Sequence, residues 1–231
     1  MIDVRRAGDR FHTAIDWLDS WHSFSFSSHY DPTNVGHGLL LVSNDDRVAP
    51  GQGFGTHAHQ DMEIVTWVLE GSLAHQDSAG NSGVITPGVA QRMSAGTGIR
   101  HSEMNASTDE PVHFLQMWVR PDTAGIEPGY EQVDIGERLD SRELVPVASG
   151  QGHEGAVHLR QEGAVLWAAR LDEGWSVTVP AAGHVHVFMA RGSARTTVDL
   201  AEGDALRLTD EPEQELTATA DDTEVLIWET T

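Results

Sequence analysis

Short strand-like runs divided by turn clusters dominate this sequence and leave room for little besides an all-β architecture. Residues 21–27 alternate in character as a half-buried strand should, and residues 39–42 have the character of a fully buried strand. Residues 64–69 and 113–119 are rich in β-branched and aromatic side chains. Turn signals such as Glu70-Gly71 separate these runs at intervals of roughly 8–12 residues, without a long helical period. This pattern predicts antiparallel sandwiches or barrels.

The second half of the chain repeats this pattern. Further strands are predicted at residues 165–169, 175–179, 184–189, 194–198, 205–208 and 225–228. Residues 121–146 are rich in Pro, Gly, Asp and Glu with weak periodicity, and they are predicted to form a linker. We therefore expect two β-barrel modules, residues 1–130 and residues 131–231. The order His-x-His, strand, glycine turn at residues 57–71 occurs again at residues 184–192, which hints at duplication.

Charge and cysteine content exclude several classes of function. The chain has 14 basic residues, all of them Arg, and 36 acidic residues, so its formal net charge is −22. Binding to nucleic acid or anionic membranes needs concentrated positive charge and is not expected. Because the chain has no cysteine, a metal must be held by His and carboxylate. The N-terminal residues lack the apolar core of a signal peptide and no apolar run could cross a bilayer, so we expect a cytoplasmic protein.

Two pairs of side chains have the spacing of metal ligands. His57 and His59 are two residues apart, so on a strand both imidazoles point to one face. His101 and Glu103 repeat this spacing some forty residues later. Two neighbouring strands could converge these four side chains on one ion, and imidazole with carboxylate suits Fe, Ni, Cu, Mn, Co or Zn. Parity alone also leaves Glu63 open as the carboxylate, because it shares the face of His59.

The residues around these ligands resemble a known family. Gly51, the His57-x-His59 pair, Glu63 and the strand to Gly71 are similar to the first cupin motif, and the segment from Gly98 to Asn105 is similar to the second. The runs Glu63-Ile64-Val65-Thr66-Trp67-Val68-Leu69-Glu70-Gly71-Ser72 and Ser94-Ala95-Gly96-Thr97-Gly98-Ile99 resemble the pirin family more closely still. The resemblance is strong over about residues 1–120 and loose beyond.

The resemblance implies a bicupin whose N-terminal barrel binds one divalent metal ion and whose C-terminal barrel is degenerate. Pirin-like proteins use the carboxylate two residues after the third histidine, which implies that Glu103 is the ligand. Glu63 is then expected behind the ligands, where it would orient a histidine. His184 and His186 have no later histidine as partner, so no metal is expected in the second barrel.

Bacterial members of this family resemble quercetin 2,3-dioxygenases, which implies a flavonol substrate and dioxygen. In that chemistry the flavonol loses its 3-hydroxyl proton, dioxygen adds, and the central ring opens with loss of carbon monoxide. Glu103 could serve as metal ligand and as general base. A planar polyphenol needs an apolar slot, and the expected pocket residues are Phe26, Phe54, Met62 and Trp118.

Two other classes of function remain open at the level of sequence. Pirins are also known as non-enzymatic, metal-dependent regulators that bind a protein partner, and cupins include isomerases and hydrolases. Among the remaining histidines, His75 and His113 are expected to be surface or strand residues rather than part of a site.

Overall fold

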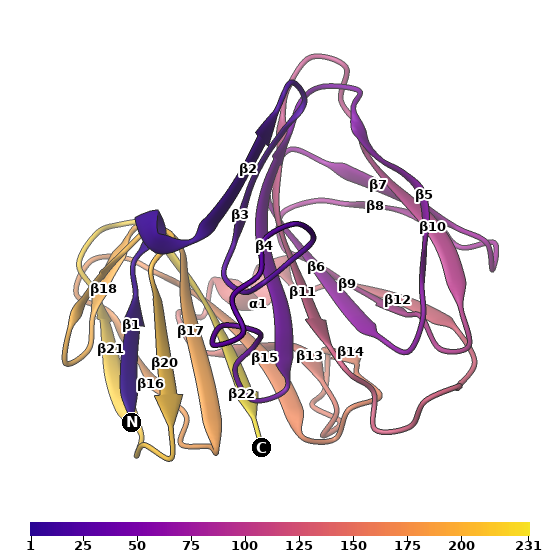
Figure 1. Ribbon diagram of the computed structural model, residues 1–231. Coiled ribbons are helices and arrows are strands. Elements are labelled where there is room, and N and C mark those ends of the chain that lie inside the picture. The colour runs from indigo at the N-terminus through magenta and orange to yellow at the C-terminus, as the bar shows by residue number, and fades with distance from the viewer.

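The computed structural model describes residues 1–231, and strands make up almost all of its regular structure. Four sheets form two modules that lie side by side (Figure 1). The regular structure outside the sheets is the four-residue helix α1 (Gly136–Leu139) and the 3₁₀ turn η1 (Ala7–Asp9). The predicted all-β fold with two cupin-type modules is confirmed.

Each module contains one large and one small sheet. The large sheet of the first module has the strand order β12 (Gly129–Asp134), β9 (Val89–Ser94), β6 (Glu63–Glu70), β11 (Val112–Val119), β4 (Leu40–Val48), β3 (Leu18–His22) and β2 (Phe11–Ile15). Its small sheet has the order β5 (Gly53–His59), β10 (Ile99–Asn105), β7 (Leu73–Asp77) and β8 (Ser82–Ile85).

The second module repeats this division. Its large sheet has the order β1 (Ile2–Arg5), β20 (Ala205–Thr209), β17 (His184–Arg191), β22 (Thr223–Thr230), β15 (Ala164–Leu171), β13 (Val145–Ser149) and β14 (Val157–His158). Its small sheet has the order β16 (Ser176–Val179), β21 (Gln214–Ala218), β18 (Ser193–Arg195) and β19 (Asp199–Ala201).

The largest hydrophobic core lies between the modules. It contains 24 buried residues drawn from both large sheets, among them Trp67 of β6 and Trp228 of β22. Because side chains alternate along a strand, β6 turns Val65, Trp67 and Leu69 toward this core. Its other face, with Ile64 and Val68, packs inside the first module. The two modules are therefore joined by a dry interface between their large sheets.

The interiors of the two modules differ in character. The second module is filled by 15 buried residues that are all aliphatic or Met. His184 and His186 have the parity of Phe188, which packs in the inter-module core. They therefore point away from the second interior, and their similarity to the His57–His59 pair does not extend to position in the barrel.

Most predicted strands are present, and two segments differ. The alternating run at residues 21–27 is a strand only to His22. The following residues form a loop in which Ser25 exchanges hydrogen bonds with the backbone of Asp31 and Ser27 adopts a positive φ of 53°. The predicted strand at residues 194–198 ends with β18 at Arg195, and residues 196–198 form the turn to β19. In both places hydrogen bonds of side chains or turns replace the backbone hydrogen bonds between paired strands.

The expected module boundary also needs amendment. A division at residue 130 would cut through β12, which pairs with β9 over six residues and so belongs to the first module. At the other end of the chain, β1 pairs with β20 of the second module, and Figure 1 shows it beside the C-terminal strands. The segment expected to be a linker thus contains both β12 and α1, because weak hydrophobic periodicity does not exclude a half-exposed strand.

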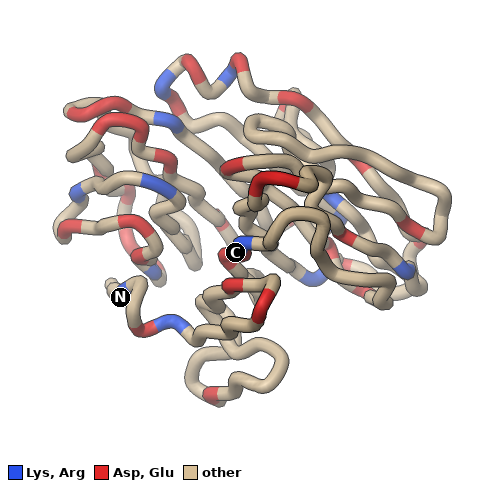
Figure 2. Tube along the Cα trace, turned by 90° about the horizontal axis from the view of Figure 1, so that it is seen from above, with Lys and Arg blue, Asp and Glu red and all other residues tan.

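The acidic residues are spread over the loops of both modules, with the arginines scattered among them (Figure 2). None of the helices is long and apolar enough to pass through a membrane.

Candidate metal centre

Two neighbouring strands of the small sheet bring three histidines together. His101 of β10 lies directly opposite His57 of β5 in the antiparallel register. The ring centroids of His57 and His101 are 4.4 Å apart, and those of His59 and His101 are 4.9 Å apart. One ligand nitrogen from each of the three lies within 4.8 Å of the others. The structure therefore assembles the predicted triad at a separation that one metal ion can bridge.

Backbone irregularities in β5 allow this approach. The pairing of β5 with β10 shifts by one residue between His101 and Glu103, which is the mark of a β-bulge and re-aims the side chains beside it. A Cβ atom at Gly53 would lie 2.2 Å from the carbonyl oxygen of Glu103. Gly53 is therefore required for the two ligand-bearing strands to lie this close.

The three imidazoles are suited to hold a cation. The Nε2 atoms of His59 and His101 are buried and have no hydrogen-bond partner, which is unusual for buried polar atoms and is resolved if both bind an ion. Burial, together with the neighbouring histidines, lowers the pKa of His59 to about 4 and that of His101 to about 3. These two rings are therefore neutral near pH 7, the state in which imidazole binds metals.

A hydrogen-bonded chain behind His101 selects its ligand atom. Nε2 of His75 lies 3.3 Å from a carboxylate oxygen of Asp77, and Nδ1 of His75 lies 3.5 Å from Nδ1 of His101. If His75 donates Nε2–H to the carboxylate, its Nδ1 accepts from His101, whose Nε2 stays free for the metal. His75 is 2% exposed and was not assigned to the site from sequence. The spacing of His75 and Asp77 on one strand face is the signal that could have found it.

We expect His75→Ala to weaken Ni²⁺ binding by roughly 10–100-fold, the usual loss when a partner of a metal-binding histidine is removed. The affinity is measured by competition with a chromophoric chelator. His153→Ala serves as the control, because His153 packs edge-on against Trp167 in the second module. Equal affinities for His75→Ala and the wild type would show that His101 needs no such support.

Glu103 is held on the large-sheet side of the centre. It is 2% exposed, and its carboxylate accepts hydrogen bonds from Gln116 at 2.7 Å and from Thr66 at 3.4 Å. Trp118 in turn donates to the Gln116 side chain at 3.1 Å. A ligand oxygen of Glu103 lies within 4.8 Å of ligand nitrogens of His101 and His75, so Glu103 forms a second set that shares His101 with the triad. Gln116 and Thr66 were not recognised from sequence, because a single polar residue in an apolar strand carries no motif.

Glu63 lies away from the histidines. Its carboxylate accepts hydrogen bonds from the Ser94 hydroxyl at 3.0 Å and from the backbone of Arg160 at 3.2 Å. Strand parity would place Glu63 on the same face as His59 only if both lay on one continuous strand. A turn separates β5 from β6, with Asp61 at a positive φ of 49°, so this expectation was wrong. Thr66 faces the centre, and Glu63, three positions earlier on the same strand, faces the second module. The expected contact between Glu63 and a metal-binding histidine is therefore not seen.

A cavity of about 380 Å³ opens beside the centre, and His57, His59 and Glu103 form part of its wall. Three of the four predicted pocket residues, Phe26, Phe54 and Trp118, line it. Met62 does not, and packs instead beside Trp118 against the small cluster that contains Ile64 and Met93. The remaining lining residues are Trp17, Leu18, Ser20, Asn44, Asp46, Gly53, Gly55 and Gln116.

Asp46 is the one further carboxyl in the wall of this cavity. Burial, with a smaller contribution from the charges of Asp45 and Glu103, raises the pKa of Asp46 to about 7, although a hydrogen bond from Ser20 acts in the opposite direction. No basic side chain forms an ion pair with it. Asp46 therefore changes charge near neutral pH.

Asp46 should make a measurable contribution to the pH dependence of stability. Its ordinary pKa is 3.8, so between about pH 4 and pH 7 the folded protein holds a proton that the unfolded chain has released. The stability that this proton provides is full below pH 4 and is lost as the pH rises to 7. The difference in the free energy of unfolding, Asp46→Asn minus wild type, should therefore increase from pH 4 to pH 8. Urea unfolding of the metal-free proteins checks this, and parallel pH profiles would contradict it.

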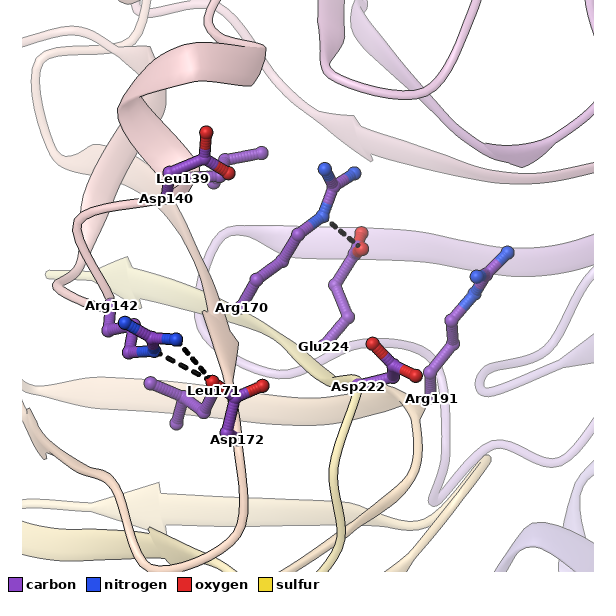
Figure 3. Close-up of a pocket in the computed structure, with 9 residues that line it drawn as sticks. All are labelled: Leu139, Asp140, Arg142, Arg170, Leu171, Asp172, Arg191, Asp222 and Glu224. Atoms are coloured by element: carbon purple, nitrogen blue, oxygen red, sulfur yellow. Dashed lines mark hydrogen bonds and ion pairs between the residues drawn. The ribbon is translucent and has the colours of Figure 1, made fainter.

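A larger cavity, of about 640 Å³, lies in the second module near the inter-module core. Its charged groups largely satisfy one another, since Arg142 pairs with Asp172 and Arg170 pairs with Glu224 (Figure 3). The lining contains no histidine. Its size therefore does not make it a competing metal centre.

Fold and site together define a class of protein, a bicupin whose N-terminal module carries a cluster of metal-binding side chains. The sequence profile described as Pirin matches residues 4–119, and the profile described as Quercetinase C-terminal cupin domain matches residues 146–230. The chain belongs to the pirin family.

Relatives agree with this assignment over nearly the whole chain. The quercetin 2,3-dioxygenase of Escherichia coli K12 is 42% identical over 99% of this chain and 98% of its own length. A Mycobacterium tuberculosis relative, provisionally named for the same activity, is 56% identical over 99% of this chain and 94% of its own length. The crystal structure of the bacterial pirin YhhW from Escherichia coli in complex with nickel(II) has a TM-score of 0.91 at 39% identity, with 100% of this chain and 99% of that chain covered. The protein is therefore of the metal-dependent dioxygenase type, with one divalent metal ion as its cofactor.

Proposed function

We propose that this protein cleaves a flavonol such as quercetin with dioxygen at the metal centre. The observation that carries the proposal is the position of the centre, because two of its histidines and Glu103 form part of the wall of a cavity that is also lined by four aromatic side chains. Its volume of about 380 Å³ falls in the range, roughly 300–1,000 Å³, of small-molecule sites. The names of the relatives support the same substrate class.

In this proposal His57, His59, His101 and Glu103 hold the ion. Glu103 is close enough to His101 to share an ion with it, and both lie on one face of β10. When bound, the metal supplies a Lewis acid and a template for the substrate oxygen. The choice among Fe, Ni, Cu, Mn, Co and Zn is left to metal availability, since imidazole and carboxylate accept them all.

Glu103 is also the proposed general base. Burial raises its pKa, so the carboxylate has a higher affinity for the 3-hydroxyl proton of the flavonol than an exposed glutamate would have. The hydrogen bonds from Gln116 and Thr66 keep the carboxylate oriented toward the centre. Trp118 fixes Gln116 through its indole N–H and presents its ring edge-on to His59, with 4.8 Å between centroids.

The aromatic side chains would hold the planar substrate and exclude water. Phe26 packs edge-on against Trp118 at 5.7 Å between centroids, and Trp17 packs in the same way on Phe54 at 5.4 Å. These two pairs belong to the wall of the cavity. Such rigid walls favour a flat polyphenol over a flexible aliphatic ligand.

The test mixes metal-loaded protein with quercetin in air and follows the flavonol absorbance. Turnover should require oxygen and metal, release carbon monoxide, and fall by about 10²–10⁴-fold in Glu103→Gln, the usual contribution of a general base. Absence of turnover with any of the six metals would overturn the proposal. Retrieval of a specific protein partner would then favour the regulatory alternative, and activity without oxygen would indicate an isomerase or hydrolase.

A further inference from the structure

An unpaired carboxyl faces the cavity from the large sheet. Asp45 and Asp46 are neighbours on β4 and point to opposite faces. Asp45 is paired with Arg10 at 2.9 Å and with His113 at 2.6 Å. Asp46 lines the cavity and has one hydrogen bond within the protein, from the Ser20 hydroxyl to its Oδ1. Its Oδ2 accepts no hydrogen bond from the protein, in a wall that also contains four aromatic side chains.

The strand register holds Asp46 in a fixed place. Ser20 of β3 lies directly opposite Asp46, and His22 lies directly opposite Asn44. The two pairs lie on the same face of the sheet, because Ser20 and His22 are two residues apart on β3 and Asn44 and Asp46 are two residues apart on β4. Nδ1 of His22 lies 2.9 Å from the Asn44 side-chain oxygen and 3.5 Å from the Ser20 hydroxyl. This buried network supports Ser20 from behind, so the carboxyl is positioned in advance of any ligand.

A ligand that fills the cavity shuts Oδ2 off from water, and leaving such a group buried without a partner is costly. A ligand that brought a hydroxyl to Oδ2 would relieve this cost and gain a charge-assisted hydrogen bond. A ligand of the same shape without that hydroxyl would leave the acceptor unsatisfied and shut off from water. Sites of this kind discriminate strongly against analogues that lack the hydroxyl.

We infer that Asp46 is a specificity-determining residue that accepts a hydrogen bond from a second hydroxyl of an aromatic ligand whose first oxygen donor lies at the metal centre. The inference rests on the proposed function for the identity of that ligand as a flavonol. It selects polyhydroxylated flavonols over those that carry the 3-hydroxyl alone. The near-neutral pKa of Asp46 agrees with this role, because such a carboxyl can share a proton with a phenol.

The test measures binding without turnover. Ni²⁺-loaded protein is titrated anaerobically with quercetin and with 3-hydroxyflavone, which lacks every hydroxyl but the metal-binding one, and binding is followed by the flavonol absorbance. We expect the wild type to bind quercetin roughly tenfold or more tightly, the usual effect of one hydrogen bond to a charged group. Asp46→Asn should bring the ratio of the two dissociation constants close to one. Galangin, hydroxylated on the fused ring only, then shows which ring reaches Asp46.

Two further variants and the outcomes complete the test. Ser20→Ala keeps the carboxyl but removes its support, and should also lower the ratio, so it replaces Asp46→Asn if that variant does not fold. Asp19→Asn removes the same charge at an exposed position of β3 and should leave the ratio unchanged. A wild type without preference, or a ratio that survives both Asp46→Asn and Ser20→Ala, would overturn the inference. Preference without turnover in air would overturn only the proposed function, and turnover without preference only the inference.

Discussion

Replacing His59 with alanine should remove the bound metal and, with it, all dioxygenase activity. The variant loses one of three imidazoles that lie within 4.8 Å of one another. Two imidazoles and the proposed ligand Glu103 remain, and loss of a direct ligand should weaken binding more than the roughly 10–100-fold that is usual when a group behind a ligand is removed. We expect metal content after dialysis to fall from about one ion per chain to near zero, and the rate to fall by about 10³-fold or more, as losing a metal that acts as Lewis acid implies. Elemental analysis and the quercetin assay measure the two effects.

The matched control for this variant is His12→Ala. His12 is exposed and bonds Asp19 at the far edge of the large sheet, so its loss should change neither metal content nor rate. Full metal occupancy in His59→Ala would show that the cation is held by other groups. The second set, which contains His75, His101 and Glu103, would then be the first to consider.

Trp67→Ala should destabilise the protein by about 3–5 kcal/mol, the usual cost of truncating a buried tryptophan. Trp67 is completely buried in the core between the modules, and its indole N–H donates to Glu224 of the second module at 2.6 Å. The variant leaves a cavity and a buried carboxylate oxygen without its donor. Urea unfolding, with metal removed from all samples, measures the free energy of unfolding.

Two variants separate the causes of this loss. Trp67→Phe fills most of the cavity and removes only the hydrogen bond, so it should cost less than Trp67→Ala. Trp175→Ala removes a tryptophan that is 50% exposed and stacks on Arg142, and should cost at most about 1 kcal/mol. A loss for Trp67→Ala as small as that for Trp175→Ala would show that the inter-module core contributes little to stability.

The parts of the fold that could be predicted from sequence are those in which local pattern and tertiary position agree. β6 and β11 are apolar at most positions because one face packs inside the first module and the other packs against the second. The loop after His22 was wrongly predicted to be a strand. Phe24 packs in the core between the modules and Phe26 lines the cavity, so tertiary contacts place these two side chains and not the alternation of a strand. The pairing of β1 with β20 and the pairing of β12 with β9 could not be predicted, because the sequence of neither β1 nor β12 carries a signal for its distant partner.

In the candidate site, too, some residues could be predicted from sequence and others could not. The histidine triad follows from two i/i+2 pairs, a spacing that places side chains on one face of a strand. The surrounding polar groups do not follow, because each is one residue in an apolar run. His22, Asn44, Gln116 and Thr66 lie in one row across β3, β4, β11 and β6, and only the register reveals that they form a continuous polar band beside the metal centre.

The pairing of β1 with β20 has a consequence for dissecting the protein. The first five residues complete the sheet of the module encoded last, and the amino group of Met1 reaches the backbone of Thr209 and the side chain of Glu211. A fragment expressed from residue 131 onward would therefore expose β20 as an open edge, which invites aggregation. Each half of the chain resembles a domain, but the first strand of the chain belongs to the sheet of the second module. A single cut near residue 130 therefore does not release two complete modules.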